Sequence, residues 1–178
     1  MSPDPQTCYQ QATHWISLFN QSLKTNGAHQ VNGASLFLAD SFWRDALALS
    51  WQLDTIIGGQ TITRAIHDQA AKTGLTAISL DEDATPPQWV SRAGTDAIEA
   101  FIKFETKDAN GRGIIRLCEI KDKIDINAAG PQWRAWTFFT AIDSLKGHEE
   151  QTGRNRPTGS SYSRDFQGPN WLDKRILA

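Results

Sequence analysis

The chain has 178 residues, a formal net charge of −2 and 39% hydrophobic residues, which fits one soluble globular domain with an extension. This charge balance excludes the strongly basic surface that nucleic-acid binding requires, so we expect no nucleic-acid partner. No apolar stretch approaches the roughly 18 residues that suggest a membrane span, and the first residues lack a signal-peptide pattern. We therefore expect a cytoplasmic chain without membrane contact, whose two cysteines, Cys8 and Cys118, bind no metal.

The first half of the chain is predicted to hold the helices. Apolar residues recur there at the three-to-four-residue spacing of an amphipathic helix, and in one stretch they alternate as in a strand. Glycines follow two of the helical stretches, where they commonly end helices. The predicted elements are a helix from Ala12 that ends near Gly27, a short helix over GASLFLAD (33–40), a strand over FWRDALALSW (42–51), and a helix that follows Gly58-Gly59 and that Gly74 closes.

The second half is predicted to be mainly sheet, so the chain as a whole is predicted to have an α+β fold. Asn110-Gly111 is a dipeptide favoured in hairpin turns, and two prolines exclude regular structure from an earlier loop. The predicted elements are a strand over LTAISL (75–80), a loop over DEDATPPQW (81–89), a hairpin within 96–122 and a last strand over PQWRAWTFFTAID (131–143). We assign residues 1–146 to this domain. Residues 147–178, rich in Gly, Pro, Ser and Arg, are assigned to an extended tail that packs on the body or on a partner.

One position in the first predicted strand carries a charge where the alternation places apolar residues. Asp45 shares its face with Trp43, whereas Arg44 points to the other face. Burying an unpaired carboxylate is costly, so Asp45 needs either a partner or a function. Two interpretations stay open: an ion pair with an arginine such as Arg116 or Arg134, or an acid–base role in a pocket.

The order of elements resembles the NTF2-like superfamily, which includes ketosteroid isomerase, scytalone dehydratase and SnoaL-type cyclases. The matching features are LFLADSFWRDALALSW (36–51) and GGQTITRAI (58–66) followed by antiparallel strands, over roughly residues 8–145. The resemblance implies a cone in which N-terminal helices pack inside a curved antiparallel sheet, with a deep pocket. It also implies a homodimer, and it places Asp45 where ketosteroid isomerase carries its aspartate base.

Three stretches resemble more closely the region that precedes the flavin domain in bacterial and fungal flavin-containing monooxygenases. They are FWRDALALSWQLDTIIG (42–58), WTFFTAIDSLKGHEE (136–150) and the tail RPTG…GPNWLDKR. In those enzymes such a tail leads into the dinucleotide-binding fold, but this sequence has no GxGxxG after a strand. Flavin and nicotinamide chemistry is therefore not carried over, and we expect no cofactor.

The candidate site combines acid–base groups with aromatic residues. The candidate catalytic residues are Asp45, His67 on the helix after Gly58-Gly59, and His14 on the first helix, which forms a pocket wall in the resembled fold. Both histidines are also compatible with a surface position, and the aromatic residues are also compatible with core packing. The candidate substrate-binding residues are Trp43, Trp51, Arg116, Trp136 and Phe138. No set of His, Cys, Asp and Glu has metal-ligand spacing, so no metal site is predicted.

These residues predict a cofactor-independent enzyme that acts on a hydrophobic natural product in an aromatic-lined pocket. It would be an isomerase, cyclase, dehydratase or hydrolase, with Asp45 as acid or base. The alternative is a non-catalytic NTF2-like domain for dimerisation or interaction, excised from a flavin-containing monooxygenase or a remnant of one. An open cavity of roughly a few hundred Å³ at Asp45 would favour the enzyme, and a cone filled by its own tryptophans would favour the interaction domain.

Overall fold

The computed structural model describes residues 2–24, 36–120 and 132–148, together with 150, 151, 153, 156 and 175. The chain divides into two units, Met1–His148 and Glu149–Ala178. Most of the predicted tail lies outside the described residues, so its extended form and its packing stay predictions.

Two helices and seven strands make up the described part of the first unit. Their bounds are α1 Pro5–Lys24, β1 Phe37–Ala46, β2 Leu53–Ile57, α2 Gly59–Thr73, β3 Ile78–Leu80, β4 Gln88–Arg92, β5 Thr95–Glu105, β6 Ala109–Glu119 and β7 Trp133–Leu145. All the strands belong to one sheet, in the order β2-β1-β7-β6-β5-β3, and β4 pairs with another part of β5.

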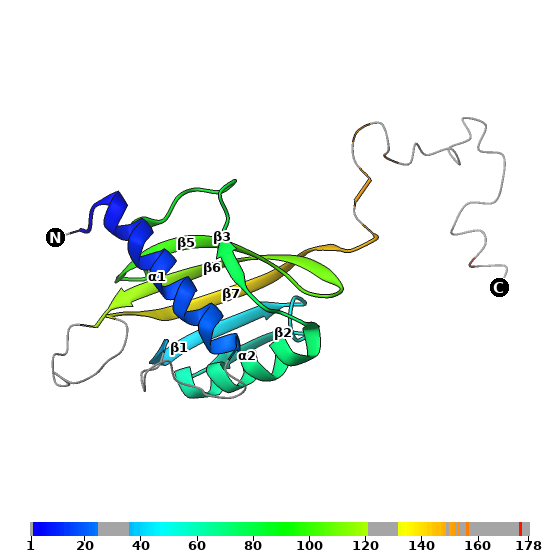
Figure 1. Ribbon diagram of the computed structural model, residues 1–178, viewed down its shortest axis with the longest axis horizontal. Helices are drawn as coiled ribbons and strands as arrows, with labels where there is room; N and C mark the ends of the chain where they lie inside the picture. Colours follow the sequence, from blue (N-terminus) through cyan, green and yellow to red (C-terminus); the bar gives the residue numbers. More distant parts are fainter. Residues whose placement is uncertain are drawn as a thin grey trace. The chain divides into compact units, whose positions relative to one another are not determined.

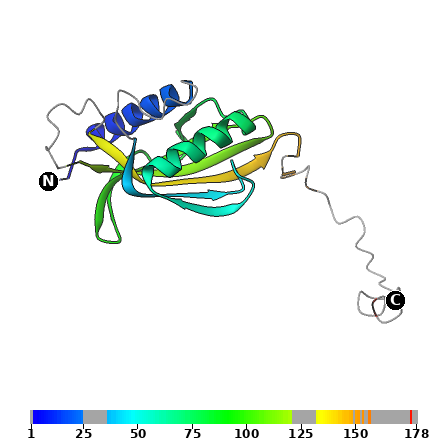
Figure 2. The same ribbon diagram turned by 90° about the horizontal axis from the view of Figure 1, so that it is seen from below.

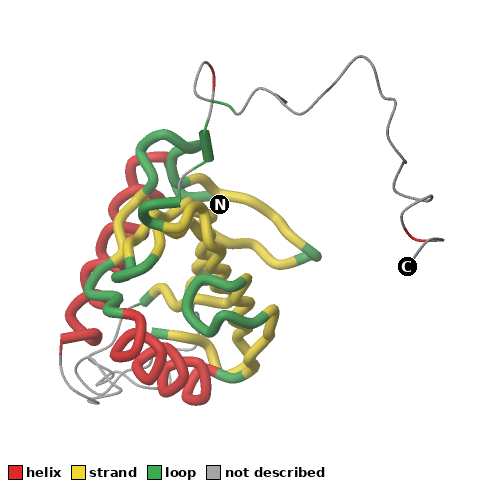
Figure 3. The backbone as a smooth tube through the Cα atoms, turned by 90° about the vertical axis from the view of Figure 1, so that its right-hand side faces the viewer, coloured by secondary structure: helices red, strands yellow, loops and turns green. Residues whose placement is uncertain are grey.

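Both helices cover the same face of the curved sheet. In Figure 1, α1 crosses the long strands and α2 lies beside β1 and β2. Figures 2 and 3 show the same layering from two further sides. The predicted α+β fold, with helices packed inside a curved sheet, is confirmed. The sheet is not wholly antiparallel, however, because β1 and β7 are parallel neighbours. The chain passes through β2 to β6 between these two strands, so no short hairpin forces them to be antiparallel.

Aromatic side chains fill the space between α1 and the sheet. Trp15 and Phe19 of α1 stack with their ring centroids 5.3 Å apart, and they lie 6.2 and 5.6 Å from the ring of Phe138 on β7. Phe37 and Trp43 of β1 complete the cluster. None of the five side chains is more than 2% exposed. The cone is therefore packed here by the protein's own rings, which contribute large buried areas and favourable tilted contacts.

The helix predicted after Gly58-Gly59 is confirmed as α2, and the first predicted helix is confirmed as α1, which begins earlier, at Pro5. The predicted end of that helix near Gly27 lies outside the described residues. Gly74 closes α2 with a φ of 74°, and its N–H donates a hydrogen bond to Ala70 O at 2.9 Å. Glycine is common in this left-handed position after a helix, and Gly74 therefore allowed the end of α2 to be predicted from the sequence.

The predicted short helix over GASLFLAD is wrong where the structure describes it, because Phe37 already begins β1. Residues 33–35 lie outside the described residues. Leu36 O accepts a hydrogen bond from Ala135 N at 2.9 Å, and the register between β1 and β7 shifts between Phe37 and Phe42. Pairing with the distant strand β7 makes this segment a strand. The register shift interrupts the alternation of apolar and polar residues that would indicate a strand in the sequence.

The predicted strand over FWRDALALSW ends early, at Ala46, and a turn leads into β2, a strand that we did not predict. Leu47 and Trp51 have φ values of 62° and 58°. These left-handed conformations break the alternation. Leu47 and Trp51 are therefore 41% and 49% exposed, whereas Trp43 is 1% exposed.

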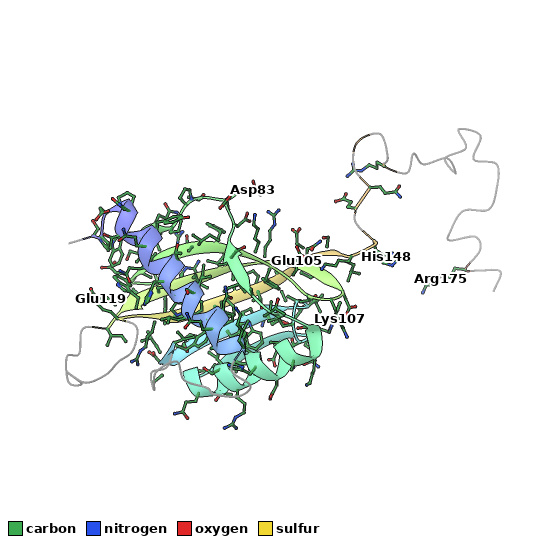
Figure 4. The ribbon with its side chains drawn as sticks, in the orientation of Figure 1. Asp83, Glu105, Lys107, Glu119, His148 and Arg175 are labelled. Carbon is green, nitrogen blue, oxygen red and sulfur yellow. The ribbon has the colours of Figure 1, made fainter. Side chains whose placement is uncertain are left out.

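The hairpin between β5 and β6 does not turn at Asn110-Gly111. The turn lies at residues 106–108, and Figure 4 shows Lys107 at this end of the hairpin. Gly111 lies within β6 opposite Phe104, whose ring occupies the space that a Cβ atom on Gly111 would need. The glycine is thus required for close packing and not for a turn.

Candidate functional site

The carboxylate of Asp45 is buried and engaged in hydrogen bonds to neutral groups. Asp45 is 2% exposed and lies on the inner face of β1. Its Oδ2 accepts hydrogen bonds from Ser50 N at 2.8 Å, from Ser50 Oγ at 2.7 Å and from Leu49 N at 3.1 Å. Its Oδ1 accepts one from Thr140 Oγ1 at 2.6 Å. Neutral donors thus take the place of the arginine that the sequence suggested as a partner.

These bonds explain why a carboxylate lies in an apolar row. Asp45 is next to the end of β1, and its side chain binds backbone N–H groups of the turn that follows, as Asp does in many turns. Thr140 also accepts a hydrogen bond from Trp43 Nε1 at 2.9 Å, so one chain of bonds connects Trp43, Thr140 and Asp45. Because donors surround both of its oxygens, Asp45 anchors the turn and has little lone-pair capacity left for a substrate proton.

A cavity of about 140 Å³ lies beside Asp45, between β2, the β1–β2 turn and α2. Its lining residues are Trp43, Asp45, Ser50, Gln52, Asp54, Ile56 and Gln69. Asp54 stands directly opposite Asp45 across the two strands and is exposed. Asp54 was not predicted as a site residue, because β2 was not predicted from the sequence. The cavity is smaller than the roughly 300–1,000 Å³ typical of small-molecule sites.

The two candidate histidines do not line the cavity at Asp45. His14 is exposed on α1. His67 is half-buried on α2, where it lines a cavity of about 10 Å³ together with Phe19 and Phe37. That volume has room for one water molecule at most. The structure therefore does not bring the three candidate catalytic residues into one site, and their catalytic roles stay predictions.

Arg116 belongs to an ion-pair network centred on Glu99. Its Nη2 lies 2.7 Å from Glu99 Oε2, and Arg92 Nη2 lies 3.0 Å from Glu99 Oε1. Burial alone raises the pKa of Glu99, but hydrogen bonds and charge from the two arginines outweigh it and lower the pKa below its ordinary value. Arg134 is not a partner of Asp45 either, since among the described residues its buried Nε has no hydrogen-bond partner. The predicted ion pair of Asp45 with Arg116 or Arg134 is wrong.

The four candidate aromatic residues do not form one pocket. Trp43 and Phe138 belong to the packed cluster, and of the four only Trp43 also lines the cavity at Asp45. Trp51 lies in the exposed turn after β1. Trp136 is half-buried on β7, where the register with β6 shifts. Their roles in substrate binding stay predictions.

Exposed apolar side chains gather instead on the β1–β2 hairpin. Among the described residues, seven large apolar side chains are exposed, and five of them belong to this hairpin. These five residues, here called the hairpin surface, are Phe42, Leu47, Trp51, Leu53 and Ile57. Leu53 and Ile57 are 65% and 60% exposed, and Ile57 faces Phe42 across the strands. This surface was not predicted from the sequence, because the predicted strand continued to Trp51 and β2 was not predicted.

Other reactive groups add little to the site. Burial raises the pKa of the Cys8 and Cys118 thiols, and the negative charges of Asp40 and Asp96 raise that of Cys118 further. In the described part of the chain, no cluster of three His, Cys, Asp or Glu residues could hold a metal ion. Within the same residues, no helix has the length and apolar character to cross a membrane.

Similarity to known proteins is found among solved structures. No family model matches the sequence, and no curated protein matches it. An NTF2-like superfamily protein from Salmonella enterica subsp. enterica serovar Typhimurium str. LT2 is 16% identical with a TM-score of 0.46, and the match covers 89% of this chain and 100% of that one.

Two further solved structures are similar to the chain. A steroid delta-isomerase from Pseudomonas aeruginosa is 11% identical with a TM-score of 0.40, over 77% of this chain and 82% of that one. A DUF4783 family protein from Bacteroides ovatus ATCC 8483 is 10% identical with a TM-score of 0.43, over 72% and 92%. These similarities concern the path of the backbone, so the function is argued from the residues of this chain.

Proposed function

We propose that the chain is a non-catalytic NTF2-like domain that associates with another protein chain through the hairpin surface. The observation that carries the proposal is the clustering of exposed apolar side chains on β1 and β2. Contiguous exposed apolar patches on soluble proteins typically mark interaction sites. The aromatic packing next to α1 also supports the proposal, because buried rings occupy that part of the cone.

The resemblance to the region that precedes the flavin domain in flavin-containing monooxygenases supports the same class of function. In this proposal the domain provides contact surface, and any flavin chemistry belongs to a separate domain. The first partner to test is a second copy of the chain, because the superfamily resemblance implies a homodimer.

Sedimentation velocity of the full chain over a concentration series tests the proposal. We expect the average mass to rise from that of a monomer towards that of a dimer as concentration increases. Leu53→Ser and Ile57→Ser should weaken this association, since each removes apolar area from the hairpin surface. Tyr9→Ser is the matched control, because Tyr9 is 50% exposed on α1, outside the hairpin surface. A wild-type chain that stays monomeric at every concentration contradicts the proposal.

A second candidate function is a small-molecule enzyme, including a cofactor-independent isomerase. The cavity beside Asp45, in which Asp54 provides a second and exposed carboxylate, favours this candidate. Asp54 would be the base, because its side chain is exposed whereas donors surround both oxygens of Asp45.

Turnover of a small β,γ-unsaturated ketone to its conjugated isomer, followed by ultraviolet absorbance, tests this second candidate. The enzyme candidate predicts turnover that Asp54→Asn abolishes and that Gln88→Asn, an exposed change on β4, leaves intact. Absence of turnover above the rate in buffer, or turnover unchanged in Asp54→Asn, contradicts it.

A further inference from the structure

A cavity larger than the one at Asp45 lies at β3, β5 and β6. Its volume is about 400 Å³, which falls within the roughly 300–1,000 Å³ typical of small-molecule sites. Lys103 of β5 and Arg112 of β6 are among its lining residues. Lys103 is exposed between Ile102 and Phe104, which are 0% and 5% exposed, so its side chain lies on the face of the sheet opposite the helices.

Two cations stand directly opposite each other at this cavity. The strand registers pair Ser79 with Lys103 and Lys103 with Arg112, so a hydroxyl, an ammonium and a guanidinium form one row across three strands. Facing residues have Cβ atoms about 4.5–5.5 Å apart, and like charges directly opposite one another are destabilising. An anion bound between the two cationic side chains would remove this repulsion.

Both cations of the row have donors that a ligand could use. Lys103 has no ion pair and no side-chain hydrogen bond within the described part of the chain. Arg112 contacts two carboxylates: its Nη1 lies 3.8 Å from Asp81 Oδ2, and its Nε lies 3.3 Å from Asp143 Oδ1. Among the described residues, Nη2 of Arg112 has no ion-pair partner. The two carboxylates therefore orient the guanidinium and leave Nη2 for a ligand.

The charges around the row favour a ligand with a single negative charge. Arg112 is in contact with two carboxylates, and Glu105, labelled in Figure 4, places its Oε2 3.0 Å from Lys146 Nζ. With Lys103, these side chains comprise three cations and three carboxylates, so they have no excess positive charge that would attract a dianion. A planar carboxylate matches the geometry of a guanidinium, and hydrogen bonds between charged groups are the stronger ones.

We propose that this cavity binds a small organic monocarboxylate. Its carboxylate would lie between Lys103 and Arg112, with the hydroxyl of Ser79 as a further donor, and its apolar part would lie against Ala77 and Phe104. The inference goes beyond the proposed function and does not depend on it. The hairpin surface belongs to β1 and β2, at the other end of the sheet order from β3.

Titration of the full chain with benzoate, followed by NMR of the backbone amides, tests the proposal. Benzamide has the same ring without the charge, and phenyl phosphate carries a second negative charge. We expect benzoate to cause saturable shifts of the amides of Ser79, Lys103 and Arg112. Benzamide and phenyl phosphate should each bind with a dissociation constant about tenfold higher or more, since the first lacks charge-assisted hydrogen bonds and the second is repelled by the three carboxylates.

Two variants that each lose one positive charge separate a local contact from a general charge effect. Lys103→Gln should raise the dissociation constant of benzoate about tenfold. Arg64→Gln is the matched control and should leave it unchanged, because Arg64 is exposed on α2, which covers the other face of the sheet. Both positions are exposed, and the amide spectra show whether both variants keep the fold.

Three results would overturn the proposal: no saturable shift of the three amides, equal affinities for benzoate and benzamide, or equal affinities of the two variants for benzoate. Tighter binding of phenyl phosphate than of benzoate would overturn the assignment of a monocarboxylate. A chain that binds benzoate as expected but stays monomeric would contradict the proposed function and support this inference.

Discussion

Asp45 shows how one side chain can hold together two segments that are distant in sequence. Its oxygens bind the turn at Leu49 and Ser50 and, on β7, the hydroxyl of Thr140. A carboxylate that accepts several hydrogen bonds when buried is stabilising only while its donors stay in place. The physical role of Asp45 is therefore to fix the end of β1 and the start of the hairpin surface.

Replacing Asp45 should test this structural role directly. Asp45→Asn keeps the size of the side chain but turns one acceptor into an N–H donor that faces other donors. We expect a loss of about 2–3 kcal/mol in the free energy of unfolding, because buried donors are left unsatisfied. Asp54→Asn is the control, since Asp54 is exposed, and it should stay within about 0.5 kcal/mol of the wild type. Urea unfolding measures both; equal stability of the two variants would contradict the anchor role.

Glu99 should give the fold a dependence on acid pH. The pKa of Glu99 is lowered in the folded state from its ordinary value of 4.5, so its contribution to stability is fully present above that value. The contribution is lost as pH falls through the lower, folded-state pKa. Glu99→Gln should therefore reduce stability at pH 7 and flatten the loss of stability below pH 4.5. Unfolding midpoints measured in a pH series check this, and parallel pH curves for the two proteins would show that Glu99 has no such role.

The sequence predicted the directions of side chains better than their partners. Alternation correctly placed Trp43 and Asp45 inward and Arg44 outward, because a strand fixes these directions locally. The bonds of Asp45 to Thr140 could not be predicted, since they depend on which strand lies next to β1. The pairing of Arg116 with Glu99 was hidden for the same reason.

At the scale of elements, local signals located the helices and non-local pairing decided the strands. Gly74 marks the end of α2 because its left-handed conformation favours glycine. The segment that begins β1 was predicted as a helix, because only its pairing with β7 makes it a strand. The turn after β1 was not predicted. Its residues with positive φ are Leu47 and Trp51, whereas glycine or asparagine usually signals such a turn.

The packing of β5 on β6 provides a test at this scale. Gly111→Ala would place a methyl group in the space of the Phe104 ring, and overpacking of this kind costs about 1–3 kcal/mol. We expect the free energy of unfolding to fall by that amount. Phe104→Leu removes the ring, so adding Gly111→Ala to it should cost much less. Additive losses in the double variant would contradict the proposed contact.

At the scale of the whole molecule, the aromatic packing next to α1 and the exposed hairpin lead to the same functional account. Five aromatic rings occupy the interior next to α1, whereas five large apolar side chains of the hairpin surface meet solvent. The fold class could be predicted from the order of elements, but these two properties could not. The packing depends on how closely the rings approach one another, and the exposed surface depends on where β1 ends. Tertiary contacts determine both the ring distances and the end of β1.

Hydrogen exchange of single amides, measured by NMR at increasing protein concentration, tests most directly whether the hairpin is the contact surface. The amides of Asp54 and Ile56 bond to β1 and should be protected at every concentration, which makes them internal references. The amides of Leu53 and Ile57 belong to pairs that are not hydrogen-bonded to β1, so they point away from that strand. We expect these two amides to exchange rapidly in dilute solution and to become protected as dimer forms. Rapid exchange of both amides under conditions where the chain is fully dimeric would contradict the account.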